Sequence, residues 1–138
     1  MDILYTAVAH ATGDGRNGHT RSDDGILEAD VRMPKELGGP GGATNPEQLF
    51  AAGYAACFQS ALKLVAKQAA ADVDDSEVSA TVGIGPTPEG GFGLAVELDV
   101  NIPNVDEATA QQLAEAAHRV CPYSNATRNN IDVKLSVV

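Results

Sequence analysis

Residues 44–68 read TNPEQLFAAGYAACFQSALKLVAKQ, and this stretch decides the fold of the chain. Asn45 is a good N-cap, and Pro46 follows at the first helical position, where its missing N–H costs nothing. Gln48 completes a pattern that resembles a capping box. The sequence therefore predicts a long helix that begins at Pro46 and runs to about Gln68.

The two halves of this predicted helix differ in polarity. From Leu49 to Phe58 almost every side chain is apolar, whereas Gln59, Lys63 and Lys67 recur on one face of the second half. The first half is expected to be buried on all sides and the second half to be amphipathic. One small sheet can hardly cover a helix that is apolar all round, so we expect an intimate homodimer.

The composition narrows the class of protein. The chain has 138 residues, 43% of them hydrophobic, which fits one domain spanning residues 1–138. Its formal charge of -10 argues against nucleic acid or an anionic membrane as partner, because both need clustered Lys and Arg. No basic leader and no long apolar run is evident, so we expect a cytoplasmic protein without a membrane partner.

Strands are predicted on the N-terminal side of the central helix. Residues 3–10 form a β-prone run, residues 12–25 are rich in turn formers, and residues 27–33 alternate between apolar and polar side chains. A three-stranded meander is expected. The Gly- and Pro-rich segment 34–43 lacks the Lys-Ser/Thr of a phosphate-binding loop, so we interpret it as a close-packed connector.

Two strands, a helix and a final strand are predicted on the C-terminal side. Residues 78–84 and 92–102 alternate strictly and predict an antiparallel hairpin. A second helix is expected to begin at Asp106 and to be stopped by Pro122, and residues 131–137 alternate as a closing strand. The order of elements predicts an α+β fold built on antiparallel sheet.

The two cysteines, Cys57 and Cys121, lie far apart in the sequence, which excludes a CxxC redox or zinc-ribbon motif. In a reduced compartment they bind metal, act in catalysis or are simply buried. His118 adds a ligand to a possible zinc site, but no fourth ligand is obvious beyond His10 and His19. Inert packing is the ordinary role of a thiol within a buried helix.

The expected environments of the two thiols differ. Cys57 is predicted at mid-helix, so it needs a nearby cation if it is to be a thiolate at neutral pH. The candidates are Arg16, Arg21 and Arg128, because only arginine stays charged when buried. Cys121 is predicted at a helix C-terminus, whose partial negative charge disfavours a thiolate. This asymmetry suggests Cys57 as the attacking thiol and Cys121 as the resolving thiol.

Four stretches of the chain resemble the organic hydroperoxide resistance (Ohr) branch of the OsmC/Ohr family. They are NPEQLFAAGYAACF (45–58), CPYSNATRNNIDV (121–133), ELGGPGGA (36–43) and VGIGPTPEGGFGLAVEL (82–98). The resemblance extends over essentially the whole chain. It implies an antiparallel sheet wrapped around a long central helix in an intertwined homodimer.

The resemblance also implies a function. The family reduces organic hydroperoxides, including those of fatty acids, to alcohols in defence against oxidative stress. Cys57 would be the peroxidatic cysteine, oxidised to a sulfenic acid, and Cys121 would then form a disulfide with it. The expected reductant is dihydrolipoamide or a lipoylated protein, and no metal, flavin or haem is expected. The catalytic arginine and glutamate map onto Arg16 and Glu47, with Arg21 as the alternative arginine.

The chemistry gives these positions specific tasks. Arg16 would hold Cys57 as a thiolate, and Glu47 would hold Arg16 through a bidentate ion pair. Ten residues separate Glu47 from Cys57, about 15 Å of rise along one helix, so the two cannot easily serve one site in the same chain. We therefore expect active sites at the interface of the homodimer, each containing cysteines of one subunit and Arg16 and Glu47 of the other.

An apolar lining around Cys57 would suit the tail of a lipid hydroperoxide. The expected substrate-binding residues are Leu49, Phe50 and Phe58, for which ordinary core packing is the competing interpretation. Two other functional classes also remain open: a redox sensor or apolar-ligand carrier without turnover, and a zinc-binding structural module.

Overall fold

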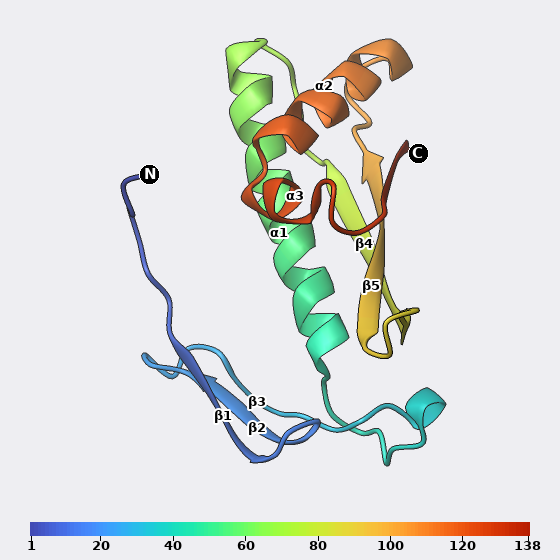
Figure 1. Cartoon of the computed structure of the whole chain (residues 1–138). Helices are drawn as coiled ribbons and strands as arrows, with labels where there is room; N and C mark the ends of the chain where they lie inside the picture. The colour runs from blue at the N-terminus through green and yellow to red at the C-terminus, as the bar shows by residue number, and fades with distance from the viewer. The chain divides into compact units, whose positions relative to one another are not determined.

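The computed structural model describes residues 1–138, and the chain divides into two compact units, residues 1–49 and 50–138. The assignment of residues 1–138 to a single domain stays a prediction. The fold is α+β, with two three-stranded sheets and three α-helices, as the sequence predicted. Figure 1 shows the course of the chain through these elements.

The first unit contains the predicted three-stranded meander. Its strands β1 (Ala9–Asp14), β2 (Asn17–Ser22) and β3 (Glu28–Asp30) pair antiparallel in the order β1-β2-β3. Asp14 pairs with Asn17, so Gly15 and Arg16 form a two-residue turn, and Gly15 has the positive φ of 57° that such a turn favours. A 3₁₀ turn, η1 (Lys35–Leu37), follows the meander.

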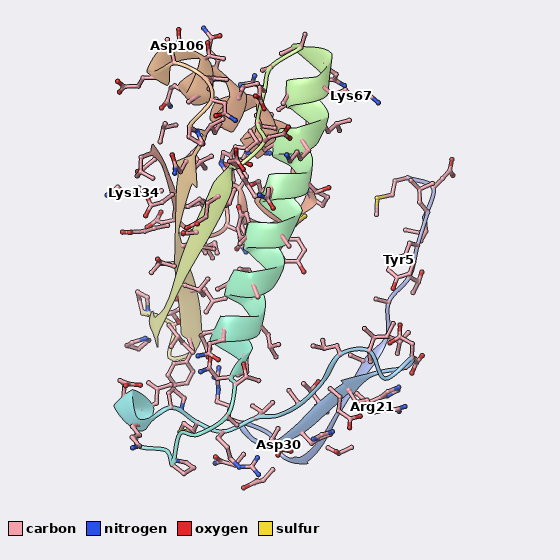
Figure 2. All side chains as sticks on the ribbon, turned by 180° about the vertical axis from the view of Figure 1, so that it is seen from behind. Tyr5, Arg21, Asp30, Lys67, Asp106 and Lys134 are labelled. Atoms are coloured by element: carbon pink, nitrogen blue, oxygen red, sulfur yellow. The ribbon has the colours of Figure 1, made fainter.

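The prediction of a strand over residues 3–10 was wrong. The first strand begins only at Ala9, and residues 1–8 have no regular structure. Their apolar side chains are exposed, with Leu4 at 97% and Tyr5 at 80%, and Figure 2 shows Tyr5 on this extended segment. All six residues of β1 are exposed, so its position is set by the turn at Gly15 and by register, and not by apolar periodicity.

Helix α1 (Pro46–Gln68) has the predicted bounds. The backbone N–H of Gln48 donates to Asn45 Oδ1 at 2.9 Å, which is the expected N-cap bond. The side chain of Gln48 does not complete a capping box, because its oxygen accepts instead from the Thr44 hydroxyl at 2.9 Å. Both contacts satisfy polar groups where the chain enters the helix.

The expected amphipathic second half of α1 is confirmed, whereas burial of its first half on all sides stays a prediction for the homodimer. Ala61, Leu62, Val65 and Ala66 form a buried face there, opposite the exposed Lys63 and Lys67. In the first half Tyr54 and Phe58 are buried but Ala52 and Ala56 are exposed, so a single chain does not cover the helix on all sides. The sequence was interpreted as having no apolar run long enough to cross a membrane, but by length and composition α1 could do so. Its buried face packs into the core of the second unit.

The second unit places a sheet against helices. Its strands are β4 (Glu77–Pro86), β5 (Phe92–Asn101) and β6 (Val133–Val137), in the order β4-β5-β6. β4 and β5 form the predicted antiparallel hairpin, whereas β6 pairs parallel to β5, a departure from the all-antiparallel expectation. A parallel neighbour requires a crossover, which the helices between β5 and β6 supply. Figure 1 shows α1 alongside the hairpin.

Two helices form that crossover. Helix α2 (Glu107–Val120) begins at the predicted N-cap, where Asp106 accepts from the Thr109 N–H at 2.8 Å. Pro122 ends α2 as expected but also starts a second helix, α3 (Pro122–Thr127), which the sequence analysis missed. Pro favours the first position of a helix because it needs no N–H there. Cys121 thus lies between two helices, as C-cap of α2 and N-cap of α3.

Leu98 is expected to contribute strongly to the stability of this core. It is fully buried in the central strand β5, whereas Glu97 beside it is exposed on the opposite face of the sheet. Leu98→Ala should lower the free energy of unfolding by about 2–5 kcal/mol, because it removes buried contacts and leaves a cavity. Urea denaturation at fixed protein concentration measures this loss. Glu97→Ala is the control, and an equal effect of both variants would contradict the assignment.

Candidate functional site

Arg16 and Glu47 form a bidentate ion pair within the first unit. Arg16 Nη1 donates to Glu47 Oε2 and Arg16 Nη2 donates to Glu47 Oε1, each at 2.7 Å. The turn of the β1–β2 hairpin presents Arg16, and the first turn of α1 presents Glu47. The paired groups therefore come from two local structures that the sequence determines directly.

The pair fixes the charge state of both partners. The hydrogen bond to Arg16 holds the pKa of Glu47 below its usual range, and the hydrogen bond to Glu47 raises the pKa of Arg16. Both groups are therefore charged at neutral pH. Glu47 is the less exposed partner, with 13% of its side chain accessible against 31% for Arg16. Such an anchored guanidinium has a fixed direction in which to offer its remaining donors.

The alternative arginine has a different partner. Arg21 Nε lies 3.1 Å from Glu28 Oε2, a neighbour across the β2–β3 pair, and both side chains are about half exposed. An exposed ion pair of this kind contributes little stability. Of the two arginines, Arg16 is therefore the one that Glu47 orients.

The two cysteines meet in the second unit although they are 64 residues apart. Their sulfur atoms lie 3.7 Å from each other, and both thiols are free. Cys57 comes from the middle of α1 and is half-buried, whereas Cys121, at the junction of α2 and α3, is fully buried. A disulfide needs an S–S distance of about 2.05 Å, so a small movement of the side chains would bring the two sulfurs to bonding distance once one of them is oxidised.

The environment of Cys57 contains opposing influences. Burial raises the pKa of the Cys57 thiol, a hydrogen bond from the backbone N–H of Tyr123 lowers it, and the neighbouring Cys121 raises it further. Tyr123 lies in the first turn of α3, so a helix N-terminus faces Cys57, whereas the sequence pointed only to a nearby cation. Pro122, directly after Cys121, was the available signal for that helix start.

Three aromatic side chains of α1 and α3 pack against one another in this part of the second unit. The ring centroids of Phe50, Tyr54 and Tyr123 lie 5.7 to 6.1 Å from one another. Gly53 leaves room for this packing, because a Cβ at that position would approach the Tyr123 hydroxyl to 3.0 Å. The three rings are at distances typical of favourable aromatic pairs.

The predicted substrate-binding residues have different environments. Phe50 is half-buried in the aromatic cluster, and Leu49 is half-buried at the end of the first unit. Phe58 is fully buried in the core, where its ring lies 6.4 Å from that of His118. The roles of these residues in binding a substrate stay predictions.

His118 and the two cysteines are not arranged as the ligands of a metal ion. Its Nδ1 lies 2.7 Å from the Ser124 hydroxyl, and burial together with the charge of Arg128 lowers the pKa of His118. Nowhere in the chain do three or more His, Cys, Asp or Glu side chains gather as metal ligands would. The residue is instead part of a hydrogen-bond network with Ser124 and Tyr54.

This chain is similar to known proteins over most of its length. Residues 39–136 match the model of the family described as OsmC-like protein. The organic hydroperoxide resistance protein of Xanthomonas axonopodis pv. citri is 55% identical over 137 residues, which cover 98% of this chain and 95% of that protein.

Solved structures are similar throughout the chain. An organic hydroperoxide resistance protein from Elizabethkingia anophelis, with thiocyanate bound, has a TM-score of 0.95 at 60% identity, covering 99% of this chain and 98% of that one. The OhrB protein of Bacillus subtilis has a TM-score of 0.89 at 49% identity, covering 99% and 100%. This chain therefore belongs to the OsmC-like family, in its organic hydroperoxide resistance branch.

Proposed function

We propose that this protein is a cytoplasmic thiol peroxidase that reduces organic hydroperoxides, including those of fatty acids, in defence against oxidative stress. The observation that carries the proposal is the approach to 3.7 Å of two free thiols, one in the middle of α1 and one at the junction of α2 and α3. Relatives at 51 and 55% identity are named organic hydroperoxide resistance proteins, which supports a role in hydroperoxide defence.

The first chemical step oxidises Cys57. The Cys57 thiolate attacks one oxygen of the hydroperoxide, the O–O bond breaks, and the sulfur becomes a sulfenic acid. The leaving alkoxide takes up a proton and departs as the alcohol. Since Cys57 is the more accessible of the two thiols and has the hydrogen bond from Tyr123, it is the better placed nucleophile.

The second step forms the disulfide. The sulfur of Cys121 attacks the sulfur of Cys57, the S–S bond forms and the S–O bond breaks. The leaving hydroxide combines with the Cys121 proton as water. The 3.7 Å separation of the sulfurs supports this step, because the attacking atom is already in contact with its target.

An external dithiol then restores the enzyme. A lipoyl-type dithiol, free or carried by a protein, reduces the disulfide to two thiols and is itself oxidised to a cyclic disulfide. No bound cofactor takes part in this proposal. The exchange needs only access to one sulfur of the protein disulfide.

In the proposed mechanism Arg16 and Glu47 act as a pair at the interface of a homodimer. Burial raises the pKa of Cys57, and no cation of residues 50–138 is among the groups that act on it. We propose that Arg16 of the partner subunit stabilises the Cys57 thiolate and the developing alkoxide, while Glu47 orients that arginine. The sequence distance between Glu47 and Cys57 on one helix supports this assignment to different subunits.

The test is consumption of an organic hydroperoxide with dihydrolipoamide as electron donor, comparing the wild type with Cys121→Ser. The wild type should turn over many times. Cys121→Ser should reduce about one equivalent of peroxide and then stop, with Cys57 accumulating as sulfenic and then sulfinic acid by mass spectrometry. A wild type that is oxidised but never turns over would instead indicate a redox sensor, and one that does not react would indicate a carrier.

A further inference from the structure

Three buried side-chain hydroxyl groups form a hydrogen-bond network between α1 and α3. The Tyr54 hydroxyl is 2.8 Å from Ser124 Oγ and 3.1 Å from Thr127 Oγ1. Tyr54 and Ser124 are fully buried, and Thr127 is 5% exposed. His118 Nδ1 extends the network through its 2.7 Å contact with Ser124 Oγ.

This network connects the same two elements as the cysteines. Tyr54 precedes Cys57 by three residues on α1, so the two lie on neighbouring parts of one helix face. Ser124 and Thr127 belong to α3, whose N-cap is Cys121. The hydrogen bonds from Tyr54 therefore link the helix that carries one sulfur to the short helix that begins at the other.

Burying these hydroxyl groups costs free energy, and the hydrogen bonds between them give α3 a fixed position in return. Three hydroxyls in an apolar core are more expensive than apolar groups of the same shape unless they are well paired. A helix of six residues has little stability of its own, so its position depends on contacts with its surroundings. Directional bonds from the buried Tyr54 supply a fixed position that apolar packing alone specifies less sharply.

We propose that Tyr54 is a positioning residue that, through Ser124 and Thr127, holds helix α3 so that Cys121 stays within reach of Cys57. This role rests on the proposed peroxidase function and deepens it at the step that forms the disulfide. Tyr54 acts on Cys121 through the two residues of α3 to which its hydroxyl is hydrogen-bonded. Its loss slows closure of the S–S bond far more than the first oxidation, which also depends on the accessibility of Cys57.

Tyr54→Phe is the appropriate variant because it leaves no buried group without a partner. Ser124 Oγ keeps its contact with His118, and Thr127 Oγ1 keeps its bonds to the backbone oxygens of Tyr123 and Ser124. The ring volume is unchanged, so the variant should fold. Tyr5→Phe is the matched control, since it removes the hydroxyl of an exposed tyrosine in the other compact unit.

The measurement follows single-turnover oxidation by an organic hydroperoxide, quenched with a thiol-alkylating reagent and read by mass spectrometry. In Tyr54→Phe the sulfenic acid should form at close to the wild-type rate, and the disulfide should close about tenfold more slowly, at the low end of what two lost hydrogen bonds contribute. The slower closure should raise the yield of sulfinic acid. Tyr5→Phe should behave as wild type. Closure at the wild-type rate in Tyr54→Phe would overturn the proposal.

A second oxidant separates this proposal from the proposed function. A diazene takes two electrons and two protons from the thiols and becomes a hydrazine, so it forms the same disulfide without any peroxide. Tyr54→Phe should again close about tenfold more slowly than wild type, even if the wild type has no peroxidase activity. If Tyr54→Phe does not fold, Thr127→Val removes one of the two bonds, and unchanged closure in that variant would overturn the proposal.

Discussion

Replacing Cys57 by serine is expected to lower the rate of hydroperoxide reduction by roughly a thousandfold or more, the scale of effect seen when an enzyme loses its nucleophile. A serine hydroxyl is scarcely ionised at neutral pH and cannot be oxidised to the sulfenic acid that the cycle requires. The half-buried position of Cys57 on α1 accommodates the smaller oxygen without a large change in packing.

The measurement is the steady-state rate with dihydrolipoamide, at equal protein concentration and with circular dichroism to verify the fold. Ala56→Ser is the matched control, because it places the same hydroxyl on the neighbouring, exposed residue of α1. That control should keep the wild-type rate. Activity retained in Cys57→Ser would disprove the assignment of the attacking thiol.

Arg16→Ala is expected to lower the rate by about a hundredfold at neutral pH, the scale for removing one charged group that stabilises a reacting anion. Without the guanidinium, burial keeps the pKa of Cys57 raised, so less thiolate is present. The rate of the variant should therefore climb as the pH rises, over a range in which the wild type is already constant. Arg21→Ala is the control, since Arg21 pairs with Glu28 and should leave the rate unchanged.

Co-expression tests whether Arg16 acts across the dimer. A chain with Arg16→Ala keeps Cys57, and a chain with Cys57→Ser keeps Arg16, so a mixed dimer contains one intact site if the two residues come from different subunits. Equal amounts of both chains should then restore about a quarter of the wild-type activity, since half of the symmetric dimers are mixed and each has one intact site. No restoration would assign Arg16 and Cys57 to the same subunit.

The sequence predicted those elements whose ends have strong local signals. Asn45 and Pro46 defined the start of α1, and Asp106 defined the start of α2, because capping depends on a few neighbouring residues. The strict alternation of residues 92–102 defined β5 within one residue. The ion pair of Arg16 with Glu47 followed from the family resemblance together with its chemistry.

Elements that depend on distant contacts were less predictable. Residues 3–10 look like a strand by composition, yet pairing begins at Ala9, because the turn at Gly15 determines the register. The parallel pairing of β6 with β5 is a matter of topology, which alternation of side chains does not encode. Helix α3 was missed because Pro122 was interpreted only as the end of a helix.

Parts of the candidate site likewise depend on distant contacts that local sequence patterns do not encode. Tyr123 and Ser124 acquire their roles only because α3 turns toward α1, a placement that no local pattern in CPYSNAT announces. Cysteine spacing alone also left inert packing and metal binding open. The 3.7 Å approach of the two sulfurs is a property of the folded second unit.

The unequal burial of the two cysteines determines the direction from which the oxidised protein can be regenerated. Cys121 has no exposed surface, whereas part of Cys57 is accessible. In thiol–disulfide exchange the incoming thiolate must approach the sulfur that it attacks along the line of the S–S bond. In the proposed cycle an external thiol would therefore bond first to Cys57, with Cys121 as the leaving group. The mixed-disulfide intermediate of that cycle would be carried by the same residue that reacts with the oxidant, so substrate and reductant would share one entrance.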